Sequence, residues 1–85
     1  MAQGKAVALP QRALDLLRWT LEYHRRTGYM PSVREQAAAF GMASTNGVRY
    51  YLRMLDDCGY LIRAGTPGMA RTLRVTPAGQ RAAAP

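Results

Sequence analysis

The chain has 85 residues, with twelve lysines and arginines against five aspartates and glutamates, which gives a net charge of +7 at pH 7. A chain of this length forms one small domain that buries about 60% of its unfolded surface, so a large active-site cleft is not expected. The basic excess favours an anionic partner, either a nucleic acid or a membrane surface, and a single cysteine excludes an internal disulfide and a cysteine metal cluster.

Eleven of the twelve basic residues are arginines. The planar guanidinium suits phosphates and guanine edges, although a GC-rich genome would produce the same bias. The N-terminus has no secretory apolar core, and no apolar run approaches the roughly 18 residues of a membrane span. We therefore expect a soluble, cytoplasmic protein, with residues 1–8 as a flexible N-terminal arm.

The first predicted element is a helix from about Leu9 to Arg26, with Pro10 in its first turn and Thr27-Gly28 at its end. Its core face is expected to consist of Ala13, Leu16, Leu17, Thr20 and Tyr23 or His24. Leu14 and Leu21 lie off that face. Either the helix is more buried than usual, or these leucines contact a second copy or another protein; a wrong choice of face is the alternative.

The run Ser32-Val33-Arg34-Glu35 has the S-x-x-E form of a capping box, in which the serine and glutamate each bond the other's backbone N–H. It predicts a second helix from about Val33 to Phe40 that ends at Gly41. Gln36 occupies a position where an aliphatic side chain would pack well, and the sequence offers no reason for it.

A third helix is predicted between Ser44 and Gly59, with Ser44 or Thr45 as its N-cap. Its core stripe consists of Val48, Leu52 and Leu55, with Tyr51 at the edge, and its opposite side carries Asn46, Arg49, Tyr50 and Arg53. Two helices joined by a short glycine turn indicate a helix-turn-helix, the packing of a plain helix bundle being the alternative.

After Gly59 the apolar period changes to two, which predicts strands at residues 60–64 and 71–75 around a turn-rich loop at 65–70. No acidic residue follows Asp57, so this hairpin is basic. The expected fold is mainly α with a small β-hairpin, a winged helix-turn-helix of three helices and a two-stranded wing. It spans residues 9–76, and residues 77–85 are expected to be a flexible C-terminal tail.

The chain resembles the N-terminal DNA-binding domain of the LexA family of SOS-response repressors, without a gap from about Leu9 to Leu61 and then loosely through the wing. The residues that carry the resemblance are Leu9, Arg12, the run from Thr27 to Glu35, Ala37, Gly41, Ser44, Asn46, Val48, Leu52, Leu55 and the run from Gly59 to Leu61. The most specific of them form the family's Gly-Tyr-x-Pro-Ser/Thr-x-x-Glu motif. The resemblance implies that the helix beginning at Ser44 lies in the major groove, with Asn46, Gly47, Arg49 and Tyr50 facing the bases.

The departures from the family are informative too. LexA repressors commonly carry smaller or acidic residues where this chain has Arg49 and Tyr50, so the SOS operator is not assumed to be its target. Gln36 replaces an aliphatic residue. The family's self-cleaving domain has no counterpart in these 85 residues, so we expect neither cleavage-driven induction nor the dimer contact which that domain supplies.

The preferred hypothesis is a small bacterial or phage transcription regulator, repressor-like, that binds double-stranded DNA sequence-specifically and associates with the nucleoid. The candidate base contacts are Asn46, Gly47, Arg49, Tyr50 and Arg53. The candidate phosphate contacts are Ser32, Arg34, Ser44, Thr45, Arg63, Arg71 and Arg74. The candidate surface for a homodimer or a heteromeric protein partner is Leu14 and Leu21.

A winged-helix adaptor that modulates another repressor or RNA polymerase is the alternative. The arginines argue against it, whereas the adjacent acids Asp56-Asp57, near the end of the third helix, would repel phosphate. RNA binding lacks a module signature. We expect no enzyme, metal or cofactor, because the sequence shows no catalytic set, phosphate loop or metal-spaced cluster.

Overall fold

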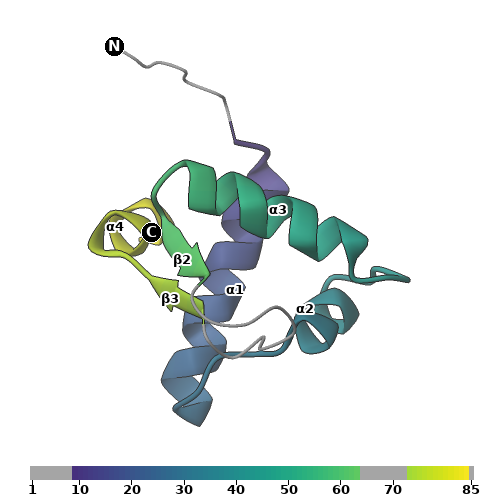
Figure 1. Ribbon diagram of the computed structural model, residues 1–85. Coiled ribbons are helices and arrows are strands. Elements are labelled where there is room, and N and C mark those ends of the chain that lie inside the picture. Colours follow the sequence, from purple (N-terminus) through teal and green to yellow (C-terminus); the bar gives the residue numbers. More distant parts are fainter. Residues whose placement is uncertain (1–8, 64–72, 85) are drawn as a thin grey trace.

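The computed structural model describes residues 9–63 and 73–84 (Figure 1). Within them lie four helices and one two-stranded antiparallel sheet. The elements are α1 (Gln11–Thr27), α2 (Val33–Ala39), α3 (Asn46–Asp57), β2 (Leu61–Arg63), β3 (Leu73–Val75) and α4 (Pro77–Ala83). The predicted winged helix-turn-helix is confirmed, whereas the predicted N-terminal arm, the hairpin loop and Arg71 lie outside the described residues.

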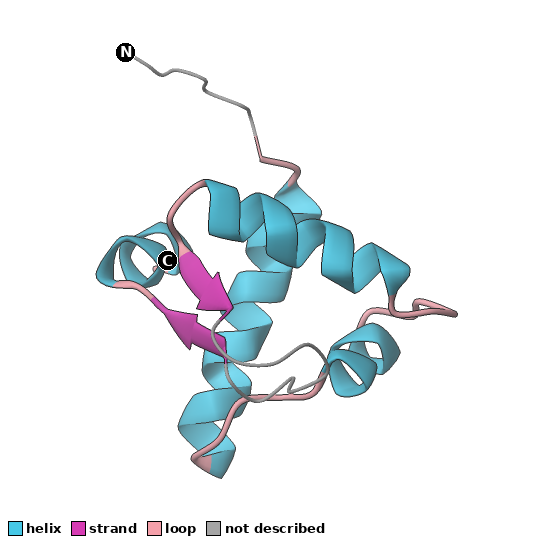
Figure 2. Cartoon of the chain, viewed as in Figure 1, coloured by secondary structure: helices cyan, strands magenta, loops and turns pink. Residues whose placement is uncertain are grey.

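The three predicted helices surround one core, with α3 crossing α1 and α2 lying beside the N-terminal end of α3 (Figures 1 and 2). The hairpin follows the other end of α3, on the opposite side of the molecule from α2. The buried apolar side chains are Ala13, Leu16, Leu17, Met30, Ala37, Val48, Leu52, Leu55, Leu61, Leu73 and Ala83. The predicted core faces are therefore confirmed, except that His24 is exposed and Tyr23 is half-buried.

The turn between α2 and α3 is tightened by hydrogen bonds. Gly41 has φ +66°, in the left-handed region that favours glycine, and the Met42 N–H donates to the Ala37 carbonyl over 2.9 Å. Arg12 of α1 donates from Nη2 to the Phe40 carbonyl over 2.6 Å, and its guanidinium lies 5.3 Å from the centre of the Phe40 ring. A cation thus satisfies a carbonyl at the end of α2, where the helix dipole is negative.

The two ends of α3 differ in how they are capped. Thr45 is the N-cap, but its side chain makes no capping bond, and the Asn46 N–H is accepted by the hydroxyl of Ser44 over 3.3 Å. At the other end Gly59 has φ +79°, and the Tyr60 N–H reaches back to the Leu55 carbonyl over 2.9 Å. Gly59 therefore ends α3 as predicted.

The hairpin pairs Leu61 with Val75, Ile62 with Arg74, and Arg63 with Leu73. Leu61 and Leu73 are buried on the core face, while Ile62 and Arg74 are exposed on the outer face. This alternation is the expected consequence of a two-residue period in which one face meets the core.

The predicted flexible tail at 77–85 is wrong, because Pro77–Ala83 forms α4. The Thr76 hydroxyl accepts the Gly79 N–H over 3.0 Å and donates to the Gly59 carbonyl over 2.6 Å. At the far end, Nε of Arg18 donates to the Ala83 carbonyl over 3.1 Å. Hydrogen bonds to α1 and to the end of α3, together with the buried Gly79 and Ala83, therefore hold this short helix in place.

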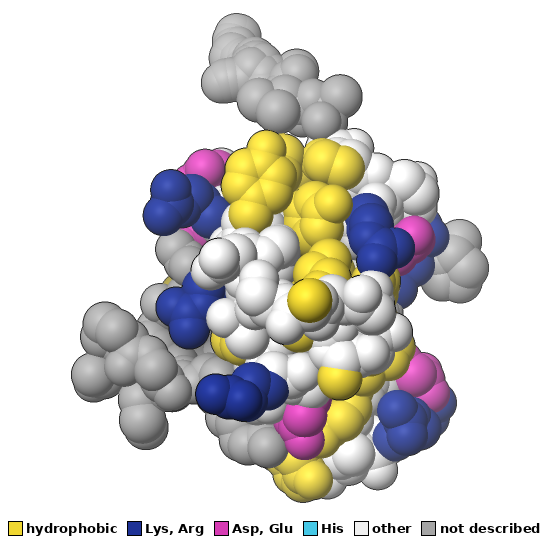
Figure 3. All heavy atoms as spheres, turned by 90° about the vertical axis from the view of Figure 1, so that its right-hand side faces the viewer, with side chains coloured by type: hydrophobic (Ala, Val, Ile, Leu, Met, Phe, Trp, Pro, Cys, Tyr) yellow, Lys and Arg dark blue, Asp and Glu magenta, His cyan; other side chains and the backbone are white. Residues whose placement is uncertain are grey.

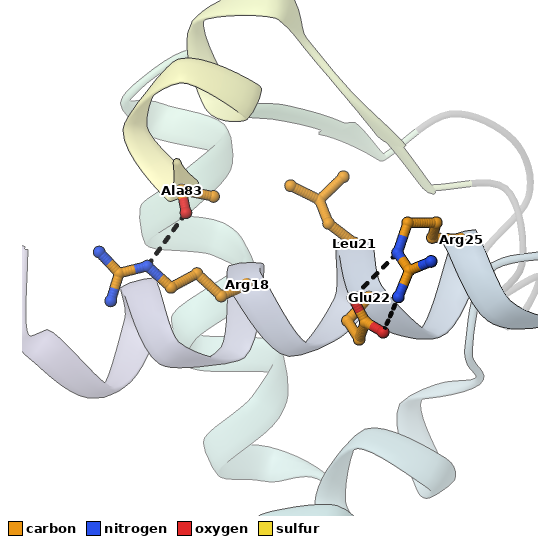
Figure 4. Close-up of a pocket in the computed structure, with 5 residues that line it drawn as sticks. All are labelled: Arg18, Leu21, Glu22, Arg25 and Ala83. Carbon is orange, nitrogen blue, oxygen red and sulfur yellow. Dashed lines mark hydrogen bonds and ion pairs between the residues drawn. The ribbon is translucent and has the colours of Figure 1, made fainter. Parts of the chain in front are cut away.

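The packing of α4 accounts for part of the apolar surplus of α1. Leu21 packs against the core and lines a hollow beside Ala83 (Figure 4), and Leu14 is half-buried. Leu21 therefore has an intramolecular role, and a protein contact through Leu14 and Leu21 stays a prediction. None of the helices in residues 9–63 and 73–84 has both the length and the apolar character that a membrane crossing requires.

Candidate nucleic-acid interface

One side of α3 is polar and open to solvent. Asn46, Arg49, Tyr50 and Arg53 are all exposed, and Gly47 is half-buried. Val48, Leu52 and Leu55 of the same helix have 0 to 3% of their surface exposed, so the opposite side of α3 is fixed in the core. A helix anchored in this way presents its polar side on a rigid support.

Arg49 is held by its own helix. Its Nε donates to Oγ1 of Thr45, one turn earlier, over 3.3 Å. The two terminal nitrogens of the guanidinium form no hydrogen bond or ion pair with the described residues. A pair of parallel N–H donors therefore remains available on the exposed side of α3.

Tyr50 and Gly47 flank Arg49 on the same part of α3. Tyr50 has 60% of its surface exposed, and its ring lies 5.7 Å, centre to centre, from that of Tyr51, which packs against the core. A Cβ added at Gly47 would lie 3.0 Å from Sδ of Met42, so the turn packs closely over the first turn of α3. Both residues thus shape the surface around the guanidinium.

The start of α2 is fixed by the predicted capping box. The Ser32 N–H donates to Oε1 of Glu35 over 2.7 Å, and the Glu35 N–H donates to the Ser32 hydroxyl over 3.0 Å. Tyr23 of α1 donates from its hydroxyl to Oε2 of Glu35 over 3.1 Å. This bond couples α1 to the start of α2, where Arg34 is exposed in the first turn.

The remaining candidates are less closely grouped. Ser44 is exposed, Arg74 is exposed on β3, and Arg63 is the last residue of β2. Arg71 lies outside the described residues. Arg12 and Tyr23 bond residues at the end and in the first turn of α2 that lie 28 and 12 positions further along the chain. The sequence indicates neither bond, although Arg12 belongs to the family resemblance and Tyr23 to the predicted face of the first helix.

The arginines fall into two groups according to their carboxylate neighbours. On α1, Arg18 lies 3.9 Å from Asp15, Arg26 lies 3.8 Å from Glu22, and Arg25 bonds Glu22 directly. The hydrogen bond from Arg25 lowers the pKa of the Glu22 carboxyl from its usual value. In contrast, Arg34, Arg49, Arg53 and Arg74 have no carboxylate partner within residues 9–63 and 73–84.

Arg12 of α1, which bonds the Phe40 carbonyl, and Arg81 of α4 also lack a carboxylate partner there. Of the six arginines with described side chains and no carboxylate partner, four therefore lie on α2, α3 and β3. Figure 3, which views the side of the molecule that carries α2 and the start of α3, shows basic side chains on both flanks of a central apolar band, with acidic side chains beside several of them. The arginines without a carboxylate partner are the charges that remain available to an anionic partner.

No comparable site lies elsewhere in the described part of the chain. The hollow between α1 and α4 is lined by Arg18, Leu21, Glu22, Arg25 and Ala83, and its charged groups bond each other or the backbone (Figure 4). Within residues 9–63 and 73–84, no group of three or more His, Cys, Asp or Glu residues is placed to hold a metal ion.

Comparison with known proteins identifies relatives of this chain. The profile of the LexA DNA binding domain matches residues 6–72. The LexA repressor of Corynebacterium jeikeium is 39% identical over 77 residues, which cover 91% of this chain and 29% of that repressor. The LexA repressor of Bacillus licheniformis is 43% identical over 58 residues, which cover 68% of this chain and 28% of the repressor. The chain thus spans less than a third of the length of these curated relatives.

Proposed function

This chain belongs to the family of LexA DNA-binding domains, and we propose that it binds double-stranded DNA sequence-specifically as a repressor-like transcription regulator. The observation that carries the proposal is the exposed polar side of α3, where Arg49 and Arg53 have no carboxylate partner among the described residues. Arg34 on α2 and Arg74 on β3, which also have none there, lie on either side of this helix. We propose accordingly that the protein acts in the cytoplasm, on the DNA of the nucleoid.

In this proposal α3 lies in the major groove, which is wide enough to admit a helix. The paired terminal N–H groups of Arg49 match the two acceptors of guanine, and the side-chain amide of Asn46 matches adenine. Tyr50 and Arg53 lie on the same side of α3 and reach a base or a phosphate. Gly47 is proposed to face the bases beside them, and its lack of a side chain makes room for Met42 of the turn.

Phosphate contacts on either side of α3 would hold it in register. Arg34 in the first turn of α2 and Arg74 on β3 are the two described arginines that suit this role. Ser32, Ser44, Arg63 and Arg71 are proposed to add to them. One domain with a few such contacts binds random DNA with a Kd of about 10⁻⁴ to 10⁻⁶ M near physiological salt.

Selection of binding sites from a random duplex pool, at about 150 mM salt, tests the proposal. We expect an enriched motif. An inverted repeat would indicate that two copies bind side by side, which would support a dimer, and a single half-site would indicate one copy. The absence of any motif would contradict sequence-specific binding by this chain alone and favour the adaptor hypothesis.

The role of Arg49 is tested by Arg49→Ala on the selected motif. We expect the preference at one base pair to fall by about 1–3 kcal/mol, because the bidentate contact to guanine is lost. Arg49→Lys is the matched control: it keeps the charge but has no planar fork, so it should retain affinity for random DNA and lose the preference. An equal loss by Arg49→Ala on the motif and on random duplexes would contradict the assignment.

A further inference from the structure

We infer that Thr45 is a positioning residue for Arg49 and that it increases the selectivity of the protein for one base pair. This inference rests on the proposed DNA binding. It gives Thr45 a role that differs from the phosphate contact expected from the sequence, because the side chain acts on Arg49 and not on the DNA.

The hydroxyl of Thr45 is not used as a helix cap. Thr45 occupies the N-cap position of α3, yet no backbone N–H donates to its side chain, and Ser44 accepts the Asn46 N–H instead. Oγ1 of Thr45 accepts from Nε of Arg49 over 3.3 Å. Threonine is branched at Cβ, which restricts its χ1 angle, so the acceptor has few alternative positions.

The bond to Nε leaves a specific part of Arg49 for the DNA. A guanidinium has five N–H donors, and with Nε engaged the two terminal nitrogens remain as a parallel pair. Fixing a long, flexible side chain before binding reduces the entropy lost when the complex forms. Thr45 therefore favours an end-on contact, in which both terminal nitrogens of Arg49 meet one guanine.

Arg53 provides an internal comparison. It lies one turn after Arg49 on the same side of α3, and the residue four positions before it is Arg49, which cannot accept a hydrogen bond. Arg53 forms no hydrogen bond with the part of the chain that the structure describes. The geometry thus distinguishes an oriented arginine, Arg49, from a free one, Arg53.

Thr45→Val removes the hydroxyl with almost no change in shape, whereas Thr45→Ser keeps it. Both would be compared with the unmodified protein, Arg49→Ala and the double variant Thr45→Val/Arg49→Ala. Fluorescence anisotropy would give the Kd for the selected motif, for the same duplex with the Arg49-dependent base pair replaced, and for a random duplex. Thermal unfolding would confirm that each variant is folded.

We expect Thr45→Val to reduce the preference at that one base pair by about 3- to 10-fold, the range typical of one exposed hydrogen bond. Thr45→Ser should restore most of the preference. In the Arg49→Ala background, Thr45→Val should have no further effect, because the residue through which it acts is gone.

Three results would overturn the inference. An unchanged preference in Thr45→Val would show that the hydrogen bond does not orient Arg49. An equal loss on all three duplexes would identify Thr45 as a phosphate contact. An undiminished effect in the Arg49→Ala background would indicate a role in the structure of α3. If the unmodified protein itself prefers no duplex, the proposed function fails, and this inference fails with it.

Discussion

Gln36 and Thr20 are the buried polar side chains of the described residues, and they bond each other across the interface of α2 and α1. Nε2 of Gln36 donates to Oγ1 of Thr20 over 2.9 Å, and the two residues are 0% and 2% exposed. Oε1 of Gln36 has no partner within residues 9–63 and 73–84. The pair explains why a glutamine occupies a position that suits an aliphatic residue: it satisfies the threonine on the facing helix.

Thr20→Val should therefore destabilise the protein by about 1–3 kcal/mol, because it leaves the whole amide of Gln36 buried without a partner. The double variant Thr20→Val/Gln36→Leu removes both polar groups and should recover most of that loss. Urea unfolding of the single and double variants would measure the difference. A double variant as unstable as the sum of its singles would show that the hydrogen bond is not what couples the two helices.

The exposed side of α3 could be predicted from the sequence because its signal is local. The helical period separates Arg49, Tyr50 and Arg53 from the buried stripe, and all three are exposed. The partners of Gln36, Glu35 and Phe40 are side chains of α1 that lie 12 to 28 residues away. The spacing of apolar residues along the chain carries no information about such pairs. The hydrogen bonds that hold α2 against α1 could therefore not be predicted from the sequence.

Among the elements, α4 was missed because its sequence has small residues and no apolar stripe. Thr76 followed by Pro77 is a helix-start signal, and the structure uses it as one, but the same pair also ends the preceding strand. Such a short helix is marginal alone and depends on tertiary packing. Gly79 shows how close that packing is, since a Cβ there would lie 2.0 Å from the Tyr60 carbonyl oxygen.

Gly79→Ala tests this packing, because helix propensity and packing predict opposite signs. In an isolated helix alanine is better than glycine by about 1 kcal/mol. Here the added methyl meets the backbone of Tyr60, so we expect a loss of about 1–3 kcal/mol in urea unfolding. The exposed neighbour Gln80→Ala is the control and should change stability by less than about 0.5 kcal/mol. A stabilised Gly79→Ala protein would show that α4 does not pack as described.

The net charge of +7 is not evenly distributed over the protein. The two acids of α1 pair with Arg18, Arg25 and Arg26, and Glu35 is engaged in the capping box of α2. Asp56 and Asp57 lie in the last turn of α3, at the opposite end from Asn46. The exposed arginines of α2, α3 and β3 are left to act outside the molecule, which is the arrangement that counterion release from DNA requires.

This distribution predicts which arginines determine the salt dependence of DNA binding. Arg74→Ala should weaken binding to all duplexes alike and lower the slope of log Kd against log salt by about one unit, because one phosphate contact is lost. Arg25→Ala removes the same charge, but from a side chain that already bonds Glu22, and the slope should remain close to that of the unmodified protein. Titrations at several salt concentrations would separate the two. If both variants lower the slope equally, the protein holds DNA through its overall charge, and β3 has no defined phosphate contact.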